Sequence, residues 1–125
     1  ESIRNVLGGQ AFATITLPLG LSVTELIENL SDIAPDLARY IIEFAFGQIY
    51  ERPGLSLQER ELLTLSSLLT AGGCEAQLQV HINAALHVGI KEEKIIEAFL
   101  HCIPYTGFPK VLNAVAVAGQ IFSGK

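Results

Sequence analysis

Two side chains capable of chemistry stand at helical spacing near the middle of the chain. Cys74 and His81 are seven residues apart. Residues at this separation lie on one face of an α-helix, about 10.5 Å apart along its axis. A thiol is a candidate redox centre or nucleophile, and an imidazole is a candidate general acid or base. The spacing therefore predicts either thiol chemistry or proton transfer on this face.

His81 lies at the edge of an apolar stripe made by Leu78, Ile82, Ala85 and Leu86. One interpretation is a core histidine satisfied by a single hydrogen bond. The other is a general acid or base in a mostly dry pocket. The remaining histidines do not stand three or four residues away, and no His/Glu set has the spacing of known ligand motifs. We therefore predict no metal site and no cofactor.

Cys74 is expected in the first turn of its helix, where the helix dipole stabilises a thiolate. Most free cysteines are instead small buried hydrophobes. A dithiol mechanism needs a second Cys three residues later, and Gln77 occupies that position. Cys102 lies in the next predicted helix. Both interpretations of Cys74, reactive thiol and structural residue, stay open.

Charged and aromatic residues elsewhere could assist the histidine. Arg60 and Glu61 are either exposed residues of a first helical turn, or one of them points inward. The carboxylate of Glu61 would then orient His81, or the guanidinium of Arg60 would bind a substrate carboxylate. Arg52 is the other candidate anion clamp. In the turn Tyr105-Thr106-Gly107-Phe108-Pro109, the Thr can cap a helix, the Gly permits close approach and the Pro can start a helix. Turn chemistry does not explain Tyr105, which is therefore a further candidate.

The elements that must position these residues are all predicted to be helices. Capping residues, glycines and prolines place their boundaries, including the capping box Ser56-Leu57-Gln58-Glu59, the break at Gly72-Gly73, a Schellman ending at Gly89-Ile90 and a stop at Pro104. The predicted helices span residues 22–30, 34–50, 56–71, 74–88, 91–103 and 109–122.

Apolar spacing predicts which helix faces are buried. We expect three inward stripes: Leu37, Tyr40, Ile41, Phe44 and Ile49; Leu62, Leu63, Leu65, Leu68 and Leu69; and Ile95, Ile96, Phe99 and Leu100.

Length predicts one domain over residues 1–125, and the helical pattern makes it all-α, with an irregular arm at 1–21 and a helical core at 22–125. Half of the 125 residues are hydrophobic and 17% are charged, and the mean hydropathy is +0.41. This apolar balance favours a homo-oligomer. The uncharged stretch from Asn5 to Thr24 contains glycines and Pro18, so it predicts an extended arm rather than a membrane span.

Charge and cysteine content exclude several classes of partner. The net charge of −5, with eight Lys and Arg and no basic run, argues against nucleic acid and against an anionic membrane surface. Two cysteines make no disulfide framework, so the cytoplasm is the expected compartment. The chain begins with Glu1 and contains no Met, which leaves open whether the native N-terminus lies upstream.

Several segments, in order and spacing, resemble the carboxymuconolactone decarboxylase family of the alkylhydroperoxidase D-like superfamily. They are residues 3–8, 46–55, 60–65, 75–81, 84–90 and 105–109. The resemblance implies an orthogonal bundle of about six helices that assembles as a homotrimer or homohexamer, with sites near subunit contacts.

The superfamily contains two chemistries. Its peroxidase members use a Cys-x-x-Cys pair with an upstream Glu and a following His. Here Gln77 replaces the second Cys, and Glu61 is one residue too far from Cys74. The decarboxylase branch needs no thiol pair and keeps the His. The true lactone decarboxylases favour a His and a Trp where this chain has Phe44 and Phe46. They also tend to carry two Asn near the positions of Leu86 and His87. These differences bear on the identity of the substrate.

The resemblance therefore implies a cofactor-free decarboxylase of a small carboxylated lactone. His81 would be the general acid, Glu61 its orienting group, Arg52 or Arg60 the carboxylate clamp and Tyr105 a second donor. The alternatives are a thiol-dependent peroxidase acting through Cys74 and a non-catalytic oligomeric protein that binds a small acid.

Overall fold

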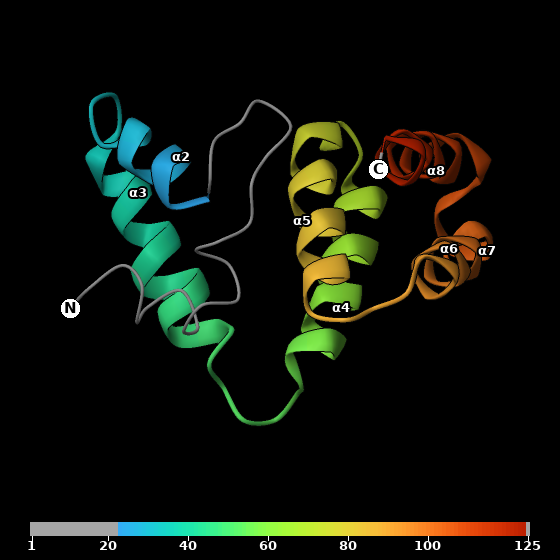
Figure 1. Cartoon of the computed structure of the whole chain (residues 1–125), viewed down its shortest axis with the longest axis horizontal. Coiled ribbons are helices and arrows are strands. Elements are labelled where there is room, and N and C mark those ends of the chain that lie inside the picture. The colour runs from blue at the N-terminus through green and yellow to red at the C-terminus, as the bar shows by residue number, and fades with distance from the viewer. Residues whose placement is uncertain (1–22, 125) are drawn as a thin grey trace. The chain divides into compact units, whose positions relative to one another are not determined.

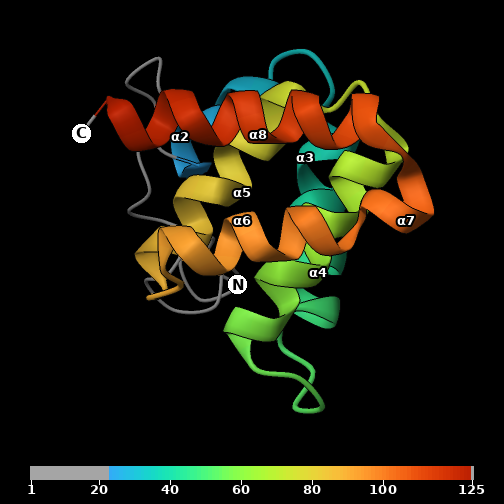
Figure 2. The same ribbon diagram turned by 90° about the vertical axis from the view of Figure 1, so that its right-hand side faces the viewer.

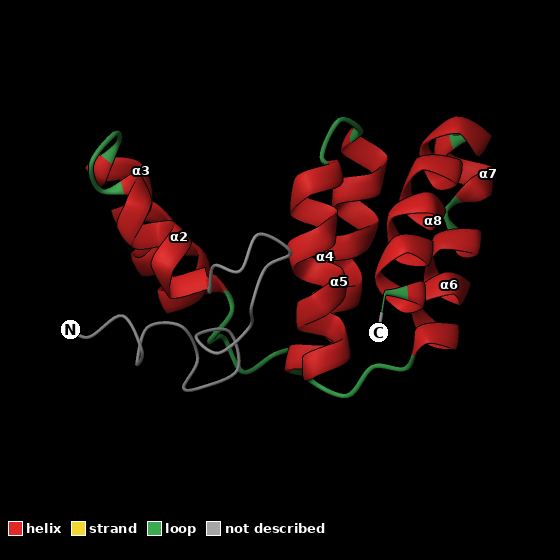
Figure 3. Ribbon diagram, turned by 45° about the horizontal axis from the view of Figure 1, so that its top comes forward, coloured by secondary structure: helices red, strands yellow, loops and turns green. Residues whose placement is uncertain are grey.

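The computed structural model of the chain describes residues 23–124. These residues are helices joined by turns and short loops, and they contain no strand (Figure 3). The all-α prediction is confirmed. The predicted arm at residues 1–21 and the predicted cap Ser22 lie outside the described residues. The chain divides into two compact units, 1–56 and 57–125, which are described separately, and the single domain stays a prediction.

The amino-terminal unit contains α2 (Val23–Leu30), α3 (Pro35–Tyr40) and the π-helix η1 (Ile41–Ile49), which continues directly from α3. Pro35 and Asp36 stand in the first turn of α3, where a fixed φ and a negative charge favour a helix start. The backbone N–H of Tyr50 donates to the carbonyl of Ala45 at 2.9 Å, a five-residue step. The long helix was predicted, but its change to π geometry was not.

The apolar stripe predicted to face inward in this unit is wrong. Leu37, Tyr40, Phe44 and Ile49 are exposed, and Ala38 and Phe46 are buried instead. A π-helix is wider than an α-helix, so apolar residues placed at the α-helical period no longer share one face across η1. In α3, only six residues long, Ala38 is the residue that packs inside.

The carboxy-terminal unit is a bundle of five helices. They are α4 (Leu57–Ala71), α5 (Glu75–His87), α6 (Glu92–His101), α7 (Ile103–Thr106) and α8 (Phe108–Ser123). Helices α4 and α5 form an antiparallel hairpin, and α6 and α8 lie beside each other and cross it (Figures 1 and 2). The core at this crossing includes Leu65, Leu69, Leu78, Ile82, Ile95, Phe99, Val111, Ala114 and Ala118.

Glycine turns fix both ends of α5. Gly72 and Gly73 have φ values of 77° and 71°, which end α4 as predicted. Gly89 has φ 94°, and the backbone N–H of Ile90 donates to the carbonyl of Ala85 at 3.0 Å. This is the predicted Schellman ending, in which a left-handed residue lets the chain satisfy the last carbonyls of the helix.

The predicted stop at Pro104 is wrong. Helix α6 already ends at His101, and Pro104 stands in the first turn of α7, where a missing N–H removes no helical hydrogen bond. Thr106 also does not cap the last helix. Its hydroxyl donates to the carbonyl of Cys102 at 3.1 Å, and Gly107, with φ 91°, precedes α8.

Leu63 and Leu100, predicted to point inward, are exposed. Successive residues of an α-helix are separated by about 100° around its axis. Leu63 is therefore about 200° from the buried Leu65, and Leu100 is about 100° from the buried Phe99. Leu62, Leu68 and Ile96 do pack against the core.

None of the helices within residues 23–124 combines the length and apolar character needed to span a bilayer.

Candidate active site

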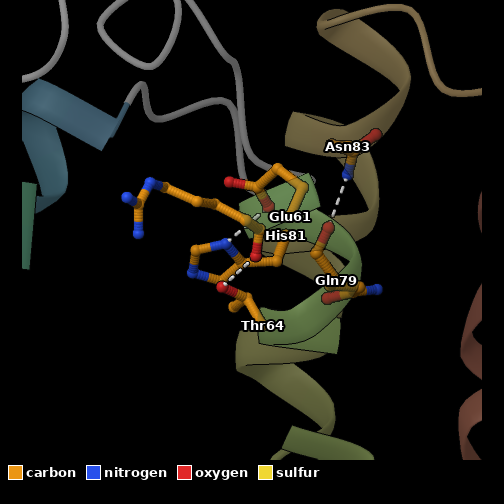
Figure 4. Close-up of polar contacts among 6 residues, drawn as sticks. Glu61, Thr64, Gln79, His81 and Asn83 are labelled. Carbon is orange, nitrogen blue, oxygen red and sulfur yellow. Dashed lines mark hydrogen bonds and ion pairs between the residues drawn. The ribbon is translucent and has the colours of Figure 1, made fainter. Parts of the chain in front are cut away.

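The centre of the α4–α5 hairpin contains a contact between a carboxyl group and an imidazole. Glu61 Oε1, on α4, lies 3.0 Å from His81 Nδ1, on α5 (Figure 4). The side chain of Glu61 is 0% exposed and that of His81 is 19% exposed. The contact therefore joins a fully buried acid to a partly exposed histidine side chain.

Helical spacing explains why these two residues meet. Glu61 stands one turn before Leu65 and two turns before Leu69, both fully buried, so it lies on the core face of α4. His81 lies at the edge of the buried face that Leu78 and Ile82 form on α5. Antiparallel packing of α4 on α5 then places the carboxyl group against the ring.

The second oxygen of Glu61, Oε2, is buried and has no hydrogen-bonding partner among the described residues. A buried polar atom without a partner costs about 1–3 kcal/mol. Leucine at this position would avoid that cost. The carboxyl group is shielded from solvent, and its described contact is with His81.

The tautomer of His81 sets the donor and the acceptor in this contact. When Glu61 is ionised it can only accept hydrogen bonds, and Nδ1 then carries a proton and donates a hydrogen bond to Glu61. The other nitrogen, Nε2, lies on the side of the ring away from Glu61 (Figure 4). Nε2 is then an acid when the ring is charged and a base when it is neutral.

Near each end of the hairpin a side chain bonds to a backbone carbonyl: Gln58 of α4 bonds to the residue after α5, and Lys110 of α8 bonds to α4. Gln58 Nε2 donates to the carbonyl of Val88 at 2.8 Å, one turn before Glu61. Lys110 Nζ donates to the carbonyl of Thr70 at 2.9 Å, near the Gly72-Gly73 turn. Sequence reasoning assigned Gln58 only to a capping box. The signal it could have used is that carbonyls in the last turn of a helix need partners.

Two further polar side chains near the pair bond to their own helices. The hydroxyl of Thr64 donates to the carbonyl of Arg60 at 2.9 Å, and Asn83 Nδ2 donates to the carbonyl of Gln79 at 2.9 Å (Figure 4). Neither Thr64 nor Asn83 was singled out from the sequence. A side chain that bonds to its own helix gives no indication in the sequence of which other residues it lies near.

The two candidate arginines lie in different units. Arg60 is half-buried and directly precedes Glu61 on α4, whereas Arg52 is exposed in the loop after η1. The unit that holds the Glu61–His81 pair thus also holds Arg60.

Cys74 lies at the cap position before α5, not in its first turn as predicted. The Gly72-Gly73 turn delays the helix start by one residue. Its half-buried thiol donates to the carbonyl of Gly72 at 3.5 Å. Cys102 is buried, and its thiol donates to the carbonyl of Ala98 at 3.4 Å. Both cysteines are free.

Tyr105 is 78% exposed on α7. Its ring packs against His101 of α6, with centroids 5.7 Å apart. Among the described residues, no hydrogen bond or ring contact joins Tyr105 to the Glu61–His81 pair.

The sequence profile of the carboxymuconolactone decarboxylase family matches residues 35–120. The chain belongs to this family. The match begins at the first residue of α3 and ends inside α8, so it includes both members of the Glu61–His81 pair. The family resemblance inferred from the sequence is confirmed.

The proteins similar to this chain include two decarboxylases. The 4-carboxymuconolactone decarboxylase of Acinetobacter baylyi is 35% identical over 100 residues, covering 80% of this chain and 74% of the relative. The nitrosuccinic acid decarboxylase of Metarhizium robertsii is 35% identical over 98 residues, covering 75% and 68%. An uncharacterized 15.0 kDa protein of Paracoccus denitrificans is 25% identical over 95 residues, covering 75% and 71%.

Proposed function

We propose that this protein is a cofactor-free decarboxylase of a small carboxylated lactone or a related acid, with His81 as its general acid. The observation that carries the proposal is the 3.0 Å contact between His81 Nδ1 and the buried Glu61. This arrangement fixes one ring nitrogen and leaves the other to transfer a proton. Membership of a family that includes decarboxylases supports the same reaction type.

The reaction requires an electron acceptor, which the substrate supplies, and a proton donor, which the site can supply. The C–C bond to the carboxylate breaks, CO2 leaves, and the electron pair passes into a conjugated lactone or another electron-withdrawing group. His81, as the imidazolium, then donates its Nε2 proton to the carbon that received the charge and recovers a proton from solvent. The Glu61 carboxylate stabilises the imidazolium and keeps the ring oriented. General acid catalysis of this kind contributes about 10²–10⁴-fold.

The names of two relatives indicate the substrate class. 4-Carboxymuconolactone is an unsaturated lactone acid, and nitrosuccinic acid is a dicarboxylic acid with a nitro group. Each combines carboxylates with a group that accepts electrons. Arg60 would bind the carboxylate that is kept, because it adjoins Glu61 on α4, and Arg52 is the alternative clamp. The role predicted for Tyr105 as a second donor is not part of this proposal, because its described contact is with His101.

The apolar composition supports a homo-oligomer, and the family resemblance suggests a homotrimer or homohexamer. The cysteine content supports the cytoplasm as the compartment. Size-exclusion chromatography with light scattering tests the first of these proposals directly.

The decisive experiment compares two histidine variants on one helix. His81→Gln keeps an amide that can donate to Glu61 but removes the acid, whereas His87→Gln makes the same change at an exposed position of α5. CO2 release from 4-carboxymuconolactone and from nitrosuccinate is measured for each. We expect turnover to fall at least about 10²-fold in His81→Gln and to stay within about twofold in His87→Gln. Full turnover by a folded His81→Gln protein would exclude His81 as the acid.

The same assay separates the alternatives. A peroxidase that uses Cys74 would lose activity in Cys74→Ser, whereas the decarboxylase would keep its turnover, because the thiol donates to a backbone carbonyl rather than to His81. A non-catalytic binding protein would bind the acid, as calorimetry would show, and release no CO2.

A further inference from the structure

We propose that the Glu61–His81 pair also catalyses hydrogen exchange on a carbon acid: it removes a proton from the decarboxylated product and replaces it from solvent, at one position only. This inference rests on the proposed function, because it assigns a second reaction to the same site. It adds an activity that requires no carboxylate to be lost.

The first step of the argument is that one atom of the pair handles protons. Glu61 is fully shielded, and its Oε1 is engaged by His81 Nδ1 at 3.0 Å. A bound molecule can therefore exchange protons with the pair only through His81 Nε2. The His81 side chain is 19% exposed, and the exchange requires that water reaches Nε2 through this exposed part.

The second step follows from reversibility. When His81 has donated its proton to carbon, the neutral ring presents an Nε2 lone pair to the C–H bond it has just formed. Glu61 still accepts from Nδ1, so the ring keeps the tautomer that a base requires. A bound geometry in which Nε2 can deliver a proton to the carbon is also one in which Nε2 can remove that proton.

The exchange balances without a co-reactant. The C–H proton moves to Nε2, and its electron pair enters the lactone or nitro group, as it did after CO2 loss. In D2O, the imidazolium exchanges this proton for a deuteron, which returns to the same carbon. No oxidant or reductant takes part, and the net change is replacement of one hydrogen by deuterium.

The third step predicts the stereochemical course. A single nitrogen acts on one face of the bound molecule. The described contacts supply no second acid–base group at the pair, since the Cys74 thiol donates to Gly72 and Tyr105 packs on His101. On a CH2 carbon, the same hydrogen is therefore removed and returned each time. Exchange should stop after one deuterium.

The experiment uses the full chain and the product that it makes. 4-Carboxymuconolactone and nitrosuccinate are each decarboxylated in H2O, and the product is transferred into D2O with fresh protein. Proton NMR and mass spectrometry then follow deuterium uptake against a buffer blank. We expect uptake of one deuterium at least about 10²-fold faster than in buffer, and no catalysed uptake with His81→Gln.

A matched variant controls for loss of a carboxylate on the hairpin. Glu75→Gln changes an exposed carboxylate in the first turn of α5, and it should exchange and decarboxylate like the unchanged protein. Glu61→Gln makes the same change at the buried position, and it should slow both reactions together.

Each remaining outcome overturns a defined part of the inference. A protein that releases CO2 but adds no deuterium beyond the blank would refute the exchange activity and leave the decarboxylase standing. Catalysed uptake of two deuterium atoms would refute the single-nitrogen mechanism. If neither substrate loses CO2, the proposed function and this inference both fail.

Discussion

The two units of the chain use similar apolar sequences in different ways. In the carboxy-terminal unit, Leu65, Leu69 and Phe99 are fully buried among five helices. In the amino-terminal unit, Tyr40 and Phe44 are more than half exposed, at 57% and 56%. The comparison shows that helical periodicity identifies a face, whereas burial requires other helices to cover it. We therefore expect the carboxy-terminal unit to carry most of the stability.

The largest effect is expected from two Phe→Ala substitutions, one in each unit. Phe99 is fully buried and Phe44 is not. Phe99→Ala should lower the free energy of unfolding by about 3–5 kcal/mol, because it removes buried apolar area and leaves a cavity. Phe44→Ala should lower it by less than about 1 kcal/mol. Urea unfolding followed by circular dichroism measures both. Equal losses would mean that another surface covers Phe44 in solution.

A smaller effect is expected from two Gly→Ala substitutions. Gly89, after α5, has φ 94°, and an added Cβ would lie 3.4 Å from Gln58 Nε2. Gly89→Ala should therefore cost about 1–2 kcal/mol. Gly54 belongs to the amino-terminal unit, and its Cβ would meet nothing within 4 Å, so Gly54→Ala should be neutral or slightly stabilising. Thermal unfolding can rank the two variants, and a reversed order would contradict the described turns.

The smallest effect is expected from two substitutions of cationic side chains. One cation joins two helices, and the other acts within a single helix. Lys110 of α8 donates to the carbonyl of Thr70 at the end of α4. Lys110→Met should cost about 0.5–1.5 kcal/mol. Arg39 pairs with Asp36 at 3.4 Å and Glu43 at 3.9 Å along one exposed helix, so Arg39→Met should cost less than about 0.5 kcal/mol. A larger loss of stability in the Arg39 variant would contradict the expectation that the carboxy-terminal unit carries most of the stability.

Features that depend on local chemistry could be predicted from the sequence. Glycines and prolines placed most helix boundaries to within a residue or two, because their backbone restrictions act in any fold. Spacing also placed Leu78, Ile82 and Ala85 on the buried face of α5. The resemblance, together with spacing, suggested that Glu61 would orient His81, and the structure brings the two side chains into contact.

Features that depend on tertiary packing could not be predicted. The change to a π-helix at Ile41 has no residue signature, so the stripe through Phe44 was assigned to the wrong side. The bond from Gln58 to the Val88 carbonyl depends on two helices meeting. The chemical roles of His81, Glu61, Cys74, Arg52, Arg60 and Tyr105 stay predictions until variants are assayed.

Glu61 and His81 are only 20 residues apart in the sequence, and they lie on consecutive helices. One contiguous segment, Leu57–His87, thus encodes both members of the pair together with the turn that sets their register. Such a segment could be transplanted into another helical scaffold as a single cassette. The recipient would need an apolar helix crossing the hairpin in the place of α8, since α8 packs on both α4 and α5.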